Sequence, residues 1–179
     1  MFKFNNFFMS WLEAMDETTP HTSKFHKESF YEHTLTVAYN AAINNTNRQL
    51  FIAALLHDIG KPETVVVREG KGATFYDHET HIDCVKLFLS EDDEDYEAVC
   101  DLIKYHMIPY KLNGPEPWRS FAEKTLLEIV HTHSSSFVSN LFALNDYDIK
   151  GTFSKKAPPT HIKQEMRQTV IGYATKLGL

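Results

Sequence analysis

The chain has 179 residues, of which 42% are hydrophobic and 23% charged, and its formal net charge is −6. This size and composition are typical of one globular domain, and we expect residues 1–179 to form it. The acidic balance argues against extended binding to duplex nucleic acid, which needs many Lys and Arg contacts to phosphates. No apolar run approaches the roughly 20 residues that cross a bilayer, so we expect no membrane partner.

The N-terminal stretch MFKFNNFFMSWLEAM is too interrupted by Asn, Ser and Glu for a signal peptide. Its aromatic residues instead predict an amphipathic helix that packs on the core. Two cysteines, Cys84 and Cys100, lie in stretches that favour helix and are too few for a disulfide framework. We therefore expect buried thiols and a cytoplasmic protein.

Two helices are predicted next along the chain. Ser29 followed by Glu32 has the spacing of a capping box, and the helix that it opens places His33 on an apolar stripe. Thr46 and Gln49 repeat this spacing before the helix NRQLFIAALLHD. Because this second helix is apolar nearly all round, we expect it to be central.

Gly60 and Pro62 then predict the end of the central helix. In residues 64–76, β-branched residues on either side of a Gly-containing turn predict a small β-hairpin. A helix is expected from about Asp77, because apolar side chains and a histidine follow at helical spacing. These residues are His78, Ile82, Val85 and Leu89.

The second half of the chain predicts further helices. The acidic run EDDED separates one helix from the next, which ends near His106, and NGPEPW predicts a loop. Ser134 can cap the helix SSFVSNLFALNDYDIKG, which Gly151 closes, and two prolines introduce a last helix over about residues 158–178. The predicted fold class is an all-α helical bundle with one small β-hairpin.

The ten histidines are the unusual feature of the composition, and several of them interrupt apolar stripes or end buried helices. Four imidazoles and two carboxylates are expected to point into one bundle interior: His33, His57, Asp58, His78, His106 and Asp148. A single buried histidine is more often a hydrogen-bonded core residue. The adjacent pair His57 and Asp58, with the others in order around it, favours a transition-metal site in the bundle core.

Two aspartates compete for the last ligand position. Asp148 continues the stripe of Phe137, Leu141 and Leu144 at helical spacing, whereas Asp146 lies about 200° away around the helix. One metal ion cannot easily use both, so we predict that Asp148 is the ligand.

This pattern resembles the HD-domain metal-dependent phosphohydrolases, and most closely the HD region attached to bacterial CCA-adding tRNA nucleotidyltransferases and poly(A) polymerases. The matching motifs cover about residues 20–151 and are FHKESFYEHTLTV, AALLHDIGKPET, ATFYDHE, LIKYHM and NDYDIKG. The resemblance implies an HD-domain fold with metal ligation by His33, His57, Asp58 and Asp148, and a second ion that would involve His78 and His106. The nucleotidyltransferase module that normally precedes this region is absent, so we expect hydrolysis and not polymerisation.

The expected reaction is hydrolysis of a small phosphorylated substrate, such as a nucleotide or an RNA-terminal phosphate ester, by metal-activated water. The expected cofactor is one or two divalent ions of Mn, Fe, Ni, Co or Zn, with Mg as a further option. Asp58 is the predicted bridging ligand, because a carboxylate has two oxygens. Lys61 either meets phosphate charge or is a solvated lysine, and Glu79 either orients a ligand or accepts a proton.

Other interpretations stay open at this point. The same six ligands also resemble those of dinuclear-iron oxygenases such as inositol oxygenase, which use iron and dioxygen. A binding module with a structural metal is disfavoured, because closed structural sites normally use Cys-rich ligation. His21 and His26 either line the mouth of the site or are exposed loop residues.

Overall fold

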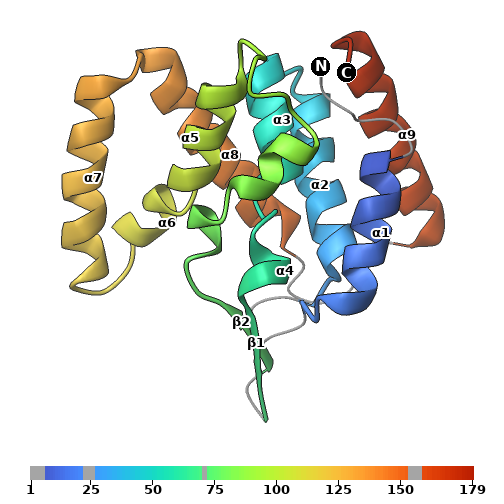
Figure 1. Ribbon diagram of the computed structural model, residues 1–179, viewed down its shortest axis with the longest axis horizontal. Helices are drawn as coiled ribbons and strands as arrows, with labels where there is room; N and C mark the ends of the chain where they lie inside the picture. Colours follow the sequence, from blue (N-terminus) through green and yellow to red (C-terminus); the bar gives the residue numbers. More distant parts are fainter. Residues whose placement is uncertain (1–6, 22–26, 70–71, 153–158) are drawn as a thin grey trace.

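The computed structural model describes residues 7–21, 27–69, 72–152 and 159–179 of the chain. This part is mostly helical with a two-stranded antiparallel hairpin, which confirms the predicted fold class (Figure 1). The elements are α1 (Met9–Thr18), α2 (Phe30–Ile43), α3 (Arg48–Leu56), α4 (Lys61–Thr64), β1 (Val65–Arg68), β2 (Gly72–Phe75), the 3₁₀ helices η2 (His78–Thr80) and η3 (Asp83–Leu87), α5 (Tyr96–Tyr105), α6 (Ile108–Leu112), α7 (Trp118–Thr132), α8 (Ser135–Gly151) and α9 (Thr160–Lys176).

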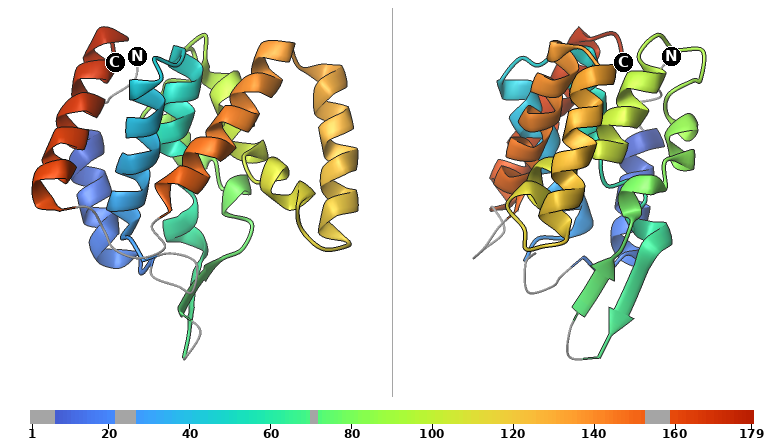
Figure 2. Two further views of the ribbon diagram at one scale, coloured as in Figure 1. Left: turned by 180° about the vertical axis from the view of Figure 1, so that it is seen from behind. Right: turned by 90° about the vertical axis from the view of Figure 1, so that its left-hand side faces the viewer.

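Helices α2 and α3 form the centre of the bundle. Helix α2 packs against α1, α3, α8 and α9, and α3 packs in addition against α5 and α8. Every side chain from Leu50 to Leu56 in α3 is buried, as expected for a helix that is apolar all round. In Figure 2, α1 and α9 lie beside α2, and the hairpin projects below the helices. The centre of the bundle is therefore a rigid frame for side chains at the ends of these helices.

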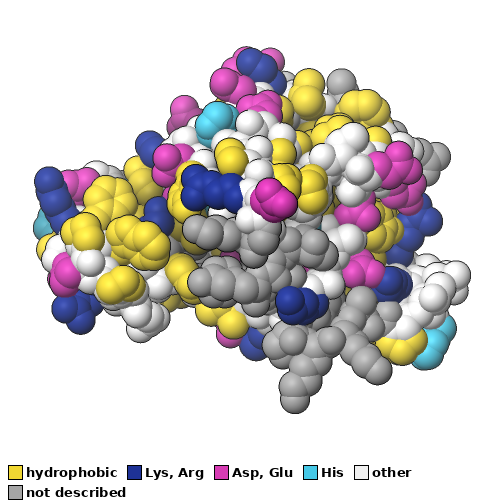
Figure 3. All heavy atoms as spheres, turned by 90° about the horizontal axis from the view of Figure 1, so that it is seen from below, with side chains coloured by type: hydrophobic (Ala, Val, Ile, Leu, Met, Phe, Trp, Pro, Cys, Tyr) yellow, Lys and Arg dark blue, Asp and Glu magenta, His cyan; other side chains and the backbone are white. Residues whose placement is uncertain are grey.

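Helix α7 stands apart from this centre and contacts α6 and α8 (Figures 1 and 2). It is absent from the elements predicted above, because its apolar side chains do not form a single stripe. Ala122 and Ile129 are buried, whereas Phe121, Leu127 and Val130 are exposed. Seen from below, hydrophobic side chains gather at this end of the molecule (Figure 3).

Two helix starts agree with the sequence. The Ser29 side chain accepts a hydrogen bond from the Glu32 backbone N–H, and the Glu32 carboxylate accepts one from the Ser29 N–H. The Ser134 side chain accepts a hydrogen bond from the Phe137 N–H at the start of α8. Both caps satisfy backbone donors that a helix start leaves unpaired, and they fix where α2 and α8 begin.

The cap predicted at Thr46 is wrong. The side chain of the next residue, Asn47, accepts the hydrogen bond from the Leu50 N–H at 2.9 Å. Asn is as good an N-cap as Thr, so the spacing alone did not distinguish the two positions.

The predicted end of α3 is also displaced. The helix ends at Leu56, and Gly60 and Pro62 lie at the start of the short helix α4. Gly60 is required there by a close approach, since a Cβ on it would lie 2.2 Å from the carbonyl oxygen of His78. This contact holds η2 directly against the turn that follows α3.

The helix predicted from Asp77 is replaced by η2 and η3. Asp77 has a φ of 59°, a left-handed conformation that breaks a regular helix. Val85 and Leu89 are nevertheless buried, so the spacing identified the core residues but not the backbone. Cys84 in η3 is only partly buried, with Sγ 3.0 Å from Glu63, whereas Cys100 is buried as expected.

Gly151, the last residue of α8, sets how closely α8 approaches α2. A Cβ on Gly151 would lie 2.5 Å from Cγ2 of Val37 and 3.4 Å from the ring of His33. We expect Gly151→Ala to lower the free energy of unfolding by about 1–3 kcal/mol, because overpacking pushes the two helices apart. Gly172→Ala in α9, where a Cβ meets nothing within 4 Å, should instead raise it by about 0.5–1 kcal/mol. Urea unfolding measures both changes, and unaltered stability of Gly151→Ala would contradict the close approach.

Candidate metal centre

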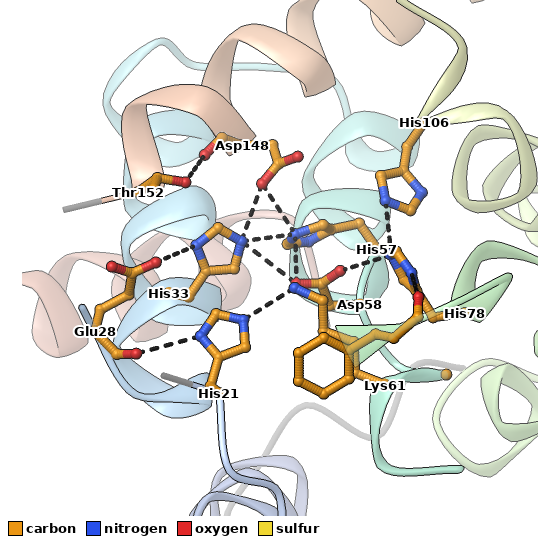
Figure 4. Close-up of polar contacts among 12 residues, drawn as sticks. His21, Glu28, His33, His57, Asp58, Lys61, His78, His106, Asp148 and Thr152 are labelled. Atoms are coloured by element: carbon orange, nitrogen blue, oxygen red, sulfur yellow. Dashed lines mark hydrogen bonds and ion pairs between the residues drawn. The ribbon is translucent and has the colours of Figure 1, made fainter. Parts of the chain in front are cut away.

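The six side chains predicted as ligands converge at one place inside the bundle (Figure 4). They are His33 from α2, His57 at the end of α3, Asp58 in the following turn, His78 from η2, His106 at the end of α5 and Asp148 from α8. Five of them are almost completely buried, and the Asp148 side chain is 21% exposed. The described atoms form two neighbouring groups of three possible ligands.

The first group consists of His33, His57 and Asp148. The Nε2 atoms of the two imidazoles are 3.2 Å apart. Oδ1 of Asp148 is 3.0 Å from Nε2 of His33 and 3.7 Å from Nε2 of His57. Two imidazole nitrogens and one carboxylate oxygen thus face the same point.

The second group consists of Asp58, His78 and His106. The Nε2 atoms of His78 and His106 are 3.3 Å apart, and Oδ1 of Asp58 is 3.1 Å from Nε2 of His78. This arrangement repeats the composition of the first group, with two imidazoles and one carboxylate.

Asp58 connects the two groups. Its other oxygen, Oδ2, lies 3.3 Å from Nε2 of both His33 and His57. One carboxylate oxygen therefore faces each pair of imidazoles, which is the placement expected of a bridging ligand.

Backbone carbonyls fix the orientation of three of these rings. Nδ1 of His57 lies 3.1 Å from the Ala54 carbonyl, and Nδ1 of His106 lies 2.6 Å from the Ile103 carbonyl. His78 has the same contact, at 2.9 Å, with the Phe75 carbonyl. A carbonyl only accepts hydrogen bonds, so Nδ1 carries a proton in each ring, and Nε2 is the nitrogen turned to the centre, where it can ligate a metal.

The fourth ring, His33, is held by a buried carboxylate. Oε1 of Glu28 lies 3.6 Å from Nδ1 of His33, on the side of the ring opposite the ligand group, and neither side chain is exposed. A carboxylate behind a ligating histidine fixes its ring and makes its other nitrogen a better ligand. The sequence did not identify Glu28, because it precedes α2 and belongs to no helical stripe.

The charges of the centre favour a bound cation. Burial acts to raise the pKa of Asp58, but His57 and Lys61 hold it well below its usual range. Burial also acts on Asp148, whose pKa the hydrogen bonds from His33 and His57 keep low. The two carboxylates thus stay ionised beside the converging imidazole nitrogens, an arrangement that a divalent cation satisfies. The donor set therefore fits a divalent metal ion.

Lys61 is buried beside the centre and is not a solvated lysine. Its exposed fraction is 5%, and its Nζ lies 2.6 Å from Oδ2 of Asp58 and 2.9 Å from Nε2 of His21. His21 is itself 2% exposed, which excludes the exposed loop position, one of the two that the sequence left open for it. His26 lies outside the described residues.

Glu79 lies behind His78 and does not face its Nε2. Its carboxylate is 3.6 Å from Nδ1 of His78 and 2.7 Å from Nζ of Lys111. Burial acts to raise the pKa of Glu79, but the hydrogen bond from Lys111 outweighs it and lowers the pKa. This position favours orientation of His78 over proton transfer at the centre.

Asp146, the competing aspartate, points away from the centre. Its side chain is 55% exposed and forms an ion pair with Lys150 at 2.5 Å. Two other described histidines, His81 and His133, also have partners outside the centre. His81 contacts Glu63, and His133 contacts Asp101.

A comparison with known protein families matches the HD domain over residues 30–143. The match includes every predicted ligand except Asp148, and it begins after His21 and Glu28. A search of curated proteins gives no match. Within the described part of the chain, no helix is both long enough and apolar enough to span a membrane.

The two aspartates of α8 provide a matched test of the first ligand group. We expect Asp148→Asn to lose metal from this group, because the amide lacks the charge that faces His33 and His57. Asp146→Asn removes the same charge from the exposed face and should keep its metal. Elemental analysis of the purified variants measures both, and equal metal content would contradict the predicted role of Asp148.

If the second ligand group binds metal, the protein should bind two metal ions. Replacement of both His78 and His106 by Ala should lower the metal content of the protein. The first ligand group should still bind part of its metal. Equilibrium dialysis against Mn²⁺, followed by elemental analysis, gives the stoichiometry. If the double variant binds as much metal as the natural protein, these two histidines are not ligands.

Proposed function

Because the chain belongs to the HD domain family, we propose that it is a metal-dependent phosphohydrolase that acts on nucleotide or RNA-terminal phosphate esters. HD domains bind divalent metals and are generally metal-dependent phosphohydrolases. The observation that carries the proposal is the pair of ligand groups that share Asp58.

In this proposal the two groups would hold two ions, with Asp58 as the residue that they share. The donor atoms are imidazole nitrogens and carboxylate oxygens, which suit Mn, Fe, Co, Ni or Zn, with Mg as a further option. A divalent ion bound there supplies activated water and polarises a phosphoryl oxygen. The protein itself contributes rings fixed through Nδ1 and a largely buried setting, in which charges interact strongly.

Lys61 is the residue that we assign to the substrate. Its ammonium is buried beside Asp58 and carries a positive charge at the edge of the ligand groups. A charge-assisted hydrogen bond from it to a phosphoryl oxygen would bind the substrate and oppose the negative charge of the reacting phosphate. This arrangement supports a phosphate ester over an uncharged substrate.

The motifs around the ligands support a nucleotide or RNA end as the source of that phosphate. The stretches FHKESFYEHTLTV and AALLHDIGKPET resemble the HD region of CCA-adding tRNA nucleotidyltransferases and poly(A) polymerases. The net charge of −6 argues for a small ligand, since a long nucleic acid would need an extended basic surface.

Phosphate release tests this proposal directly. The protein loaded with Mn²⁺, Co²⁺, Ni²⁺ or Mg²⁺ should release phosphate from a generic phosphomonoester or from nucleotides, and EDTA should abolish the release. Asp58→Ala should abolish it as well, because both ligand groups lose their shared carboxylate. Asp92→Ala, a change of an exposed aspartate, should leave it intact.

The same assay in the absence of oxygen separates hydrolysis from the alternative dinuclear-iron oxygenase. A hydrolase works equally well under nitrogen, because water is the second reactant. Activity that requires both iron and dioxygen would favour the oxygenase, and no phosphate release from any substrate with any of the four metals would refute the proposal.

A further inference from the structure

His21 lies between α1 and α2, before the span that matches the HD domain, and reaches into the metal centre (Figure 4). Its ring is buried against the rings of Phe30, His33 and Phe75, with centroids 6.1, 5.3 and 5.7 Å away. It belongs to neither ligand group. Its role must therefore lie in the polar contacts that it makes.

Those contacts define which nitrogen of His21 carries the proton. Nδ1 lies 3.2 Å from the backbone carbonyl of Glu28, which can only accept, so Nδ1 is the donor. Nε2 lies 2.9 Å from Nζ of Lys61, and an ammonium can only donate, so Nε2 is the acceptor. His21 is thus a neutral imidazole whose lone pair is aimed at the Lys61 ammonium.

Lys61 needs such an acceptor because its other polar contact is shared. Its Nζ forms an ion pair at 2.6 Å with Oδ2 of Asp58, the same oxygen that faces His33 and His57. When this oxygen is engaged by a cation, Lys61 loses part of that contact, and a buried ammonium without partners is costly. The lone pair of His21 lets the ammonium stay inside the site.

An ammonium has three N–H donors, and the Lys61 ammonium has two polar partners among the described residues, Asp58 at 2.6 Å and His21 at 2.9 Å. The Phe75 ring, with its centroid 5.2 Å from Nζ, borders the ammonium on another side. Within the described part of the chain, this leaves one donor for an incoming anion, and its direction depends on the two contacts.

We propose that His21 is a positioning residue that holds the Lys61 ammonium in place to bind a phosphoryl group. The inference rests on the proposed function for the nature of the ligand. It makes a separate claim about how the affinity for phosphate depends on two residues, His21 and Lys61.

A double-mutant cycle with inorganic phosphate as the probe tests this claim. His21→Phe keeps a ring of similar size but removes the acceptor, and it should weaken phosphate binding to the Mn²⁺-loaded protein about tenfold, the effect of one charge-assisted hydrogen bond. In Lys61→Met, the same change at His21 should have no further effect, because the ammonium is gone. Titration calorimetry gives the four dissociation constants.

Two further variants separate positioning from simple packing. His21→Gln restores an acceptor oxygen and should recover part of the phosphate affinity, whereas His131→Phe, at an exposed histidine of α7, should change nothing. Metal content should be unaltered in His21→Phe. In turnover experiments the loss in His21→Phe should appear mainly as a higher KM, with a smaller change in kcat.

Phosphate affinity that is unchanged in His21→Phe, or weakened to the same extent with and without Lys61, would overturn the inference. Absence of phosphate binding by the natural protein would overturn the inference as well. These results differ from failure of the proposed function, which is measured as absent phosphate release. If the protein releases phosphate but its affinity for phosphate does not depend on His21, the proposed function stands and the inference about His21 is wrong.

Discussion

The Asp58 carboxylate is shared by two pairs of imidazoles, with a different oxygen turned to each pair. Burying this charge is costly, and the cost is offset only if the surrounding groups are held in exact positions. The rings achieve this through their outer nitrogens, which contact backbone carbonyls or, for His33, the Glu28 carboxylate. Most of the architecture around the centre serves to hold these rings.

The helices hold the side chains of the centre in place, and the turns bring these side chains close to one another. His33 lies within α2, whereas His57 and His106 lie at helix ends, where the ring nitrogen can reach a carbonyl three residues earlier in the chain. Close contacts at Gly60 and Gly151 then bring η2 and α8 against these helices. The centre is thus assembled from secondary structure that meets at points where a side chain on either glycine would clash with the neighbouring element.

The segment before α2 adds a feature that the helices alone do not provide. The carboxylate of Glu28 lies behind His33, and its backbone carbonyl accepts from His21, whose other nitrogen holds Lys61. One residue thus links the ring of a candidate ligand to the ammonium that we assign to substrate binding.

The sequence by itself determined the helical fold, the hairpin, the caps at Ser29 and Ser134, and the side chains that gather in the centre. Those features follow from local rules of capping and periodicity, which also distinguished Asp148 from Asp146 by their faces on α8. Only the tertiary structure decided that His21 and Lys61 are buried together and that Glu28 lies behind His33. The first of these contacts joins residues far apart in the chain, and both depend on how elements dock, which no local pattern encodes.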